Sequence, residues 1–235
     1  MTDIPSLWNL RNWSRDDLLF WLRQFLMMIV GLFFFALALM LSIYANVGAN
    51  SWMVFHEGIA LQSPLTIGQA SQAVGLVMIF VSWIVGIRPG VGTVLNMLLV
   101  GWFMDLIVWS EAISDATALP TQLLMLGAAI LILGLSSGMY IKAGFGAGPR
   151  DSFNLAIIEL TNLSITKSRW AIEASVVVFG FLLGGQFGFG TIAFALLIGP
   201  SVGLGFRLFG LRRTPRPDPK PHSTAGEVRR SVASE

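Results

Sequence analysis

The sequence predicts an all-α membrane protein with six transmembrane helices, arranged as two inverted three-helix repeats. Short interfacial or re-entrant helices are expected after the first and fourth spans. Three observations lead to this fold: the composition, six apolar stretches, and an internal repeat with a fixed offset. Of the 235 residues, 54% are hydrophobic and only 12% are charged, against about 25% charged residues in an ordinary soluble domain. So little polar surface indicates a chain that folds in a bilayer.

A helix needs roughly 20 apolar residues to cross the hydrocarbon core. The first candidate span follows Arg11, Arg15 and Arg23; it is longer than a signal-peptide core and precedes no A-x-A-like cleavage site, so we expect it to be retained. Six stretches qualify as spans: about 24–45, 71–87, 92–110, 121–142, 170–186 and 190–208.

The basic residues predict the orientation, because Lys and Arg accumulate on the cytoplasmic side. With the N-terminus inside, all fifteen fall inside or at the inner boundary, whereas the outer loops carry only Glu57, Glu111 and Asp115. We therefore expect a bacterial plasma (inner) membrane protein with both termini cytoplasmic. The expected parts are an N-terminal segment (1–23), a first repeat (24–110), an external loop (111–120), a second repeat (121–209) and a disordered, charged tail (210–235).

A shift of 98 residues aligns Leu37–Leu106 with Leu135–Leu204 without a gap and gives 18 identities in 70 positions. Each copy contains three predicted spans. Because three is odd, the second copy enters the bilayer from the opposite side, which makes the repeats inverted. Inverted repeats recur in secondary transporters, where the pathway runs between the halves; this link to function is an association, since a fold does not fix a function.

The connections after the first and fourth spans are about 25 residues long, which is unusual for a loop without a role. In the second, Gly146 and Gly148 permit a tight backbone, Pro149 suits a first helical position and Asp151 suits a first turn. A helix is thus expected to begin near Pro149. Its N-terminus beside Arg150 could bind an anion; alternatively Arg150 pairs with Asp151 or with lipid phosphate.

Arg150 and Asp151 are pathway candidates, and four further titratable residues join them. His56 and Glu57 lie on the outer counterpart of that segment, where they are either proton-sensitive or simply solvated. Glu173 and Asp105 fall within predicted spans, where ionisable groups are costly and are functional candidates. Glu173 has Arg169 four residues before it, so a structural ion pair is the alternative, and Asp105 lies close enough to the interface to reach water.

Two Gly-x-Gly-Thr motifs open the third and sixth spans, and we expect them to pack helices closely; a discontinuous helix lining a pathway is the alternative. The Gly134–Gly138 stretch fits a Gly-x-Ser-x-Gly nucleophile pattern. Such a serine needs a general base, and the only later His is His222 in the tail, so a packing face is expected instead. The motif residues are Gly90, Gly92, Thr93, Gly188, Gly190 and Thr191.

Other function classes lack the necessary residues. The chain has no Cys and two His, so we expect no metal centre and no cofactor. The basic residues form no patch of the kind that binds nucleic acid. We expect no enzymatic activity, because no nucleophile–base pair or cofactor loop is present. The expected partners are the lipid bilayer and a small-molecule or ion substrate.

Several segments resemble the YczE/YyaS/YitT family of bacterial integral membrane proteins, and most of all its YczE branch. The resemblance covers the chain from the first span to the sixth and implies a multi-pass membrane protein of uncharacterised function. Where relatives have Pro and Asp beside the Trp of the first half, this chain has Ser51 and Met53. The resemblance rests on Val54–Gly58, Arg88–Asn96, Asp105, Gly146–Asp151, Arg169 with Glu173, Leu183–Thr191 and Gly199–Pro200.

We therefore expect a transporter or permease-like protein with a pathway between inverted repeats. The alternative is a non-transporting accessory or scaffold protein for a partner enzyme. Two charged candidates of the second repeat, Arg150 and Glu173, have Trp52 and Gly75 at the equivalent positions of the first. A site is accordingly expected in the cytoplasmic half of the second repeat.

Overall fold

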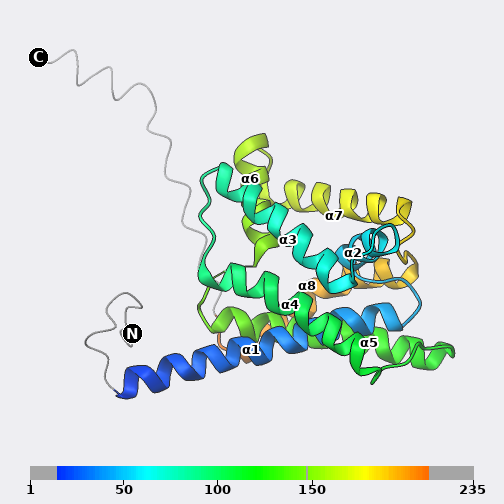
Figure 1. Ribbon diagram of the computed structural model, residues 1–235, viewed down its shortest axis with the longest axis horizontal. Helices are drawn as coiled ribbons and strands as arrows, with labels where there is room; N and C mark the ends of the chain where they lie inside the picture. Colours follow the sequence, from blue (N-terminus) through cyan, green and yellow to red (C-terminus); the bar gives the residue numbers. More distant parts are fainter. Residues whose placement is uncertain (1–14, 147, 212–235) are drawn as a thin grey trace, which may run out of the picture.

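The computed structural model describes residues 15–146 and 148–211. The predicted tail after residue 211, including His222, and the segment before residue 15 lie outside the described residues. Within these ranges the chain is all-α and forms eight helices (Figure 1). These are α1 (Arg15–Tyr44), α2 (Ser51–Leu61), α3 (Ile67–Ile84), α4 (Val91–Ser110), α5 (Leu119–Lys142), α6 (Pro149–Thr161), α7 (Ile165–Leu182) and α8 (Phe189–Leu208).

Five helices are long and apolar enough to cross a membrane: α1, α3, α4, α5 and α8. The sixth predicted span corresponds to α7, which has the same 18-residue length as α3 but contains three charged residues, Lys167, Arg169 and Glu173. The short helices α2 and α6 follow α1 and α5, in agreement with the two short helices expected from the sequence. The helix predicted near Pro149 begins at that residue.

Several helix ends differ from the predicted bounds, and local chemistry explains the differences. The first helix includes Arg15, well before residue 24, and Asp16 and Asp17 in its first turn complement the helix dipole. Helices α3 and α7 begin earlier than expected, because Thr66 and Ser164 cap their N-termini. Both also end early.

The positive φ of Gly86 (+99°) and of Gly184 (+95°) turns the chain away just after α3 and α7 end. Every helix end from Tyr44 onward recurs 98 residues later, except that α6 is two residues longer than α2. The two halves of the chain, α1–α4 and α5–α8, therefore share one pattern of helix lengths and connections.

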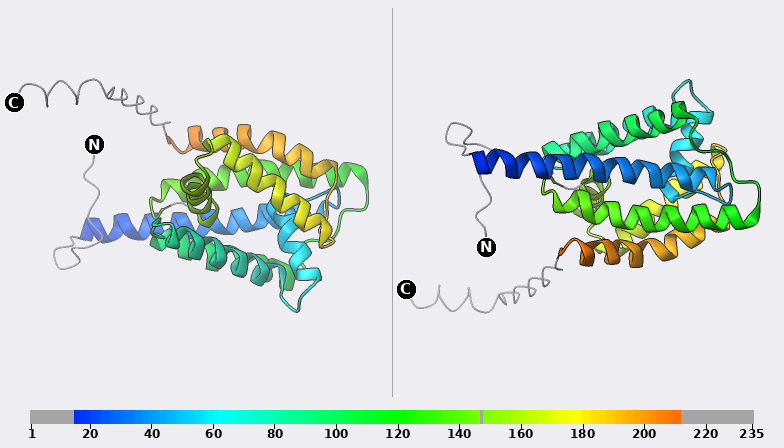
Figure 2. Two further views of the ribbon diagram at one scale, coloured as in Figure 1. Left: turned by 90° about the horizontal axis from the view of Figure 1, so that it is seen from above. Right: turned by 90° about the horizontal axis from the view of Figure 1, so that it is seen from below.

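The helices form two layers. One contains α1, α4, α5 and α8, and the other contains α2, α3, α6 and α7, with α3 packed on α4 (Figure 1). Figure 2 shows that α1, α4 and α7 run in one direction and that α3, α5 and α8 run in the other. Helix α2 lies at the end of the bundle where α1 finishes, and α6 lies at the opposite end. Each of the long helices α1, α3 and α4 is thus antiparallel to its equivalent in the second half, α5, α7 and α8.

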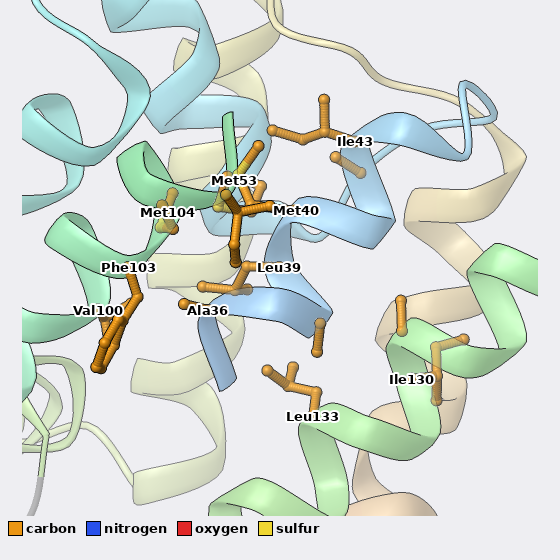
Figure 3. Packing of buried hydrophobic residues seen from close by; sticks show 14 of the residues in the cluster. Ala36, Leu39, Met40, Ile43, Met53, Val100, Phe103, Met104, Ile130 and Leu133 are labelled. Carbon is orange, nitrogen blue, oxygen red and sulfur yellow. The ribbon is translucent and has the colours of Figure 1, made fainter. Parts of the chain in front are cut away.

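The main hydrophobic core lies in the first layer. Figure 3 shows the part of it around α1, where Leu39 and Met40 pack against Met104 of α4 and Met53 of α2. Leu133 and Ile130 of α5 complete this region. A smaller apolar cluster in the second layer is centred on Trp52, Met78 and Val176. Many apolar side chains on the outside of the bundle are exposed, as expected of surfaces that face lipid.

Two close backbone contacts join the halves, and they are equivalent under the 98-residue shift. Gly92 N–H donates to Phe145 O at 2.9 Å, and Gly190 N–H donates to Val47 O at 2.7 Å. A side chain at Gly92 or Gly190 would overlap the backbone of the opposite half. The Gly-x-Gly-Thr motifs therefore allow close contact, with connecting segments of the opposite half rather than with its helices.

Small residues also join α5 to α8. A Cβ at Gly134 would overlap Ser201, whose hydroxyl donates to Ile130 O at 2.7 Å, and a Cβ at Gly138 would overlap Gly205. The hydroxyl of Ser137 donates to Leu133 O of its own helix at 2.6 Å. The Gly134–Gly138 stretch is a packing face, as expected.

Candidate functional site

A cavity of about 620 Å³ lies between the two layers and is lined by residues from all eight helices. We call it the central cavity. Its volume is within the range of roughly 300–1,000 Å³ that small-molecule sites occupy. The walls combine aromatic residues with convergent polar groups. Its polar and charged lining residues are Asn50, Ser51, His56, Ser71, Asn96, Ser137, Tyr140, Arg150, Asp151, Asn154, Arg169 and Glu173.

Arg150 and Glu173 meet at one side chain of the opposite half, Trp52. The Arg150 guanidinium carbon lies 4.9 Å from the centroid of the Trp52 ring, within range of a cation–π interaction. The Trp52 indole N–H donates to Glu173 Oε1 at 3.1 Å. Trp52 itself is 4% exposed. The indole therefore fixes a positive charge against its face and a negative charge at its edge.

The Arg150 guanidinium makes no hydrogen bond to the described part of the chain, and no carboxylate there lies within 4.0 Å of it. Neither alternative pairing, of Arg150 with Asp151 or of Arg169 with Glu173, is present among the described residues. Glu173 accepts from Trp52 instead, because Trp52 lies on α2, which packs on α7.

His56 occupies a different environment from the solvated one that the sequence allowed. It lies one turn after Trp52 on α2, is 2% exposed and lines the central cavity. Neither ring nitrogen has a hydrogen-bond partner among the described residues. Burial, and secondarily the charge of Arg150, hold the pKa of His56 well below its ordinary value. The imidazole is therefore neutral near pH 7 and offers one donor and one acceptor.

Glu57 and Asp105 lie elsewhere, in a second cavity of about 540 Å³. Glu57 Oε2 accepts from Gln186 N–H at 2.7 Å. Asp105 Oδ2 accepts from the Thr66 hydroxyl at 2.6 Å, and its Oδ1 accepts from Gly68 N–H at 2.9 Å. Glu57 therefore bonds to the connection between α7 and α8, and Asp105 bonds to the start of α3. The six candidate residues divide between two cavities.

Asp151 and Arg169 line the central cavity but are exposed, whereas Arg150 and Glu173 are half-buried. Gly148 and Pro149 also line it and start α6. The described residues contain no group of three or more His, Asp or Glu side chains placed to hold a metal ion.

Trp52 is the residue that sequence reasoning did not name as part of the site. A signal for it was present: Trp52 precedes Arg150 by 98 residues, the offset of the repeat. The structure brings these two residues, which the offset makes equivalent, into contact. His56 and Asn154 form a second equivalent pair in the same cavity.

Long apolar helices, an exposed apolar exterior and a polar central cavity define a multi-pass membrane protein. Residues 22–206 match the model of a family of unknown function, DUF6198, and the chain belongs to this family. The expected resemblance to the YczE and YyaS proteins is confirmed by the relatives.

The chain is 33% identical over 172 residues to the uncharacterized membrane protein YczE of Bacillus subtilis, covering 72% of this chain and 79% of YczE. It is 31% identical over 196 residues to an uncharacterized protein of Haemophilus influenzae, covering 81% of this chain and 87% of that protein. It is 22% identical to YyaS of Bacillus subtilis over 167 residues, covering 69% and 82% of the two chains. No solved structure shows significant similarity.

Proposed function

We propose that this protein is a permease-like transporter whose substrate occupies the central cavity, between two inverted repeats of three spans each. In this proposal α7 is the sixth span, both termini are cytoplasmic and the protein performs no chemical reaction on its substrate. The observation that carries the proposal is a cavity with convergent charged groups at the meeting point of two equivalent, oppositely directed halves.

Three features support the inverted arrangement. The helix ends recur at a constant offset, and the equivalent helices are antiparallel (Figure 2). The backbone contacts of Gly92 with Phe145 and of Gly190 with Val47 are exchanged by the same offset. A two-fold axis in the membrane plane would produce all three.

The polar residues of α7 support its role as a span rather than oppose it. Arg169 and Glu173 line the central cavity, and charged residues in transmembrane segments typically face a bundle interior or a water-filled cavity. Val178, Phe179 and Phe181 on the same helix are exposed, as expected of a surface in contact with lipid. A span that lines a polar pathway needs less overall hydropathy than one that lies in lipid on all sides.

The proposal can be tested with purified protein in liposomes and a panel of labelled amino acids, organic acids, sugars, nucleosides and inorganic ions. We expect uptake of at least one compound, and we expect Arg150→Gln to lower its rate at least about tenfold, because removing the guanidinium leaves the site without its unpaired positive charge. Arg88→Gln, at an exposed position between α3 and α4, should transport as the native protein does.

Absence of uptake across the panel, or native rates in Arg150→Gln, would contradict the transport proposal. Co-purification of a stable partner enzyme together with absent uptake would favour the accessory-protein alternative.

A further inference from the structure

The central cavity combines an unpaired cation with a carboxylate that has a free oxygen, and this combination points to the chemical class of the ligand. We propose that the cavity binds a small zwitterion, with the ligand's carboxylate on Arg150 and its ammonium group on Glu173. This inference rests on the proposed function for its biological meaning, although binding itself can be measured without transport.

The unsatisfied donors of Arg150 favour a carboxylate ligand. The guanidinium carbon lies 4.9 Å from the centroid of the Trp52 ring, and the N–H donors of a guanidinium form a planar fork. No acceptor from the described residues satisfies these donors. Paired in-plane N–H donors match a carboxylate in a bidentate arrangement. Arg150 thus lies against Trp52 while its N–H donors remain without an acceptor among the described residues.

His56 is the second, independent observation. A polar side chain that is 2% exposed is expected to have a hydrogen-bond partner, yet both ring nitrogens of His56 lack one among the described residues. His56 is among the residues that line the central cavity, and its ring centroid lies 6.3 Å from that of Trp52. A ligand with a polar head group would satisfy this imidazole, and an apolar ligand would not.

Glu173 favours a zwitterionic ligand over a simple anion. Its Oε1 accepts from Trp52, and its Oε2 accepts no hydrogen bond from the described residues. The charged lining residues are two cations, Arg150 and Arg169, and two anions, Asp151 and Glu173, so the cavity wall is electrically neutral. In a region of low dielectric, a bare anion would leave its own charge uncompensated, whereas a zwitterion keeps the cavity neutral and pairs both groups.

The inference can be tested by calorimetric binding to the purified full chain with matched probes. L-phenylalanine carries both charges, 3-phenylpropanoate lacks the ammonium group and 2-phenylethylamine lacks the carboxylate; 4-aminobutanoate, butanoate and butylamine form a smaller set. We expect at least one zwitterion to bind at least about tenfold more tightly than both of its matched compounds.

Two variants assign the contacts. Glu173→Gln should abolish the preference over the matched carboxylate, and Arg150→Gln should abolish the preference over the matched amine. Arg150→Lys keeps the charge without the planar pair of donors and should retain part of the affinity. Arg88→Gln should leave both preferences unchanged, and circular dichroism should confirm that each variant is folded.

The inference is wrong if neither zwitterion binds more tightly than its matched compounds, or if Glu173→Gln leaves the preference intact. Binding of a zwitterion without its uptake into liposomes would instead reject the transport proposal and keep the ligand class.

Discussion

Trp52 shows how a single neutral side chain can organise a charged site. Its face holds Arg150 and its N–H group holds Glu173, so two opposite charges are positioned without forming an ion pair with each other. A direct pair would satisfy both groups and leave little for a ligand to gain. Separating them by an indole keeps each available to bind.

Asp105 contrasts with Glu173, because its two oxygens already accept hydrogen bonds from the first turn of α3. We expect Asp105→Ala to lower the free energy of unfolding by about 1–3 kcal/mol, since it removes a charged acceptor from Thr66 and Gly68. Asp105→Asn should cost less. Thermal unfolding in detergent micelles would measure the effect, with the exposed Asp115→Ala as the control; equal stability of the two alanine variants would contradict a structural role.

At the residue scale the sequence supplied the charged candidates but not their surroundings. Glu173 and Asp105 both appear as carboxylates in apolar segments, and only tertiary contacts separate them into a cavity residue and a residue that fixes a helix end. His56 is the clearest example. Its neighbours in sequence indicate a connecting segment, and its burial follows from the packing of α2 on α3 and α7, which local sequence does not encode.

At the scale of elements, the first residue of α6 could be predicted, but the position of the short helices within the bundle could not. Pro149 after Gly148 marks the first residue of α6, because proline's fixed φ and missing N–H suit that position. The apolar periodicity around α7 placed a helix there, but its three charged residues left its bounds displaced by several residues. Whether α2 and α6 lie on or inside the bundle depends on contacts with the other half of the chain.

Two of the three glycines of α5, Gly127 and Gly134, allow a matched test of element packing. A Cβ at Gly134 would overlap the backbone of Ser201, whereas nothing lies within 4 Å of a Cβ at Gly127. Gly134→Ala should therefore lower the free energy of unfolding by roughly 1–3 kcal/mol through overpacking. Gly127→Ala should leave it unchanged or raise it by up to about 1 kcal/mol, since alanine favours a helix. Thermal unfolding midpoints in the same detergent would decide, and a similar effect of both substitutions would contradict the close contact of α5 with α8.

At the scale of the whole molecule, the most informative sequence feature was the 98-residue offset. It relates helix ends, two backbone contacts and the pair of residues at the centre of the cavity. The cavity itself could not be predicted, because its volume depends on how eight helices pack together. The asymmetry was visible: all four charged lining residues belong to the second half, and the first half contributes Trp52, His56 and Gly75.

The proposed inverted arrangement makes a direct prediction about the two faces of the membrane. The chain has no native cysteine. Gln62, just after α2, and Thr161, the last residue of α6, are both exposed. In intact cells a membrane-impermeant maleimide should label Gln62→Cys but not Thr161→Cys, and permeabilisation should expose the second site. Cysteine at Ser114, exposed between α4 and α5, should label from outside and report that the protein is inserted. Labelling of Gln62→Cys and Thr161→Cys from the same face would contradict the inversion, because an odd number of spans must separate the two positions if the halves enter the bilayer from opposite sides.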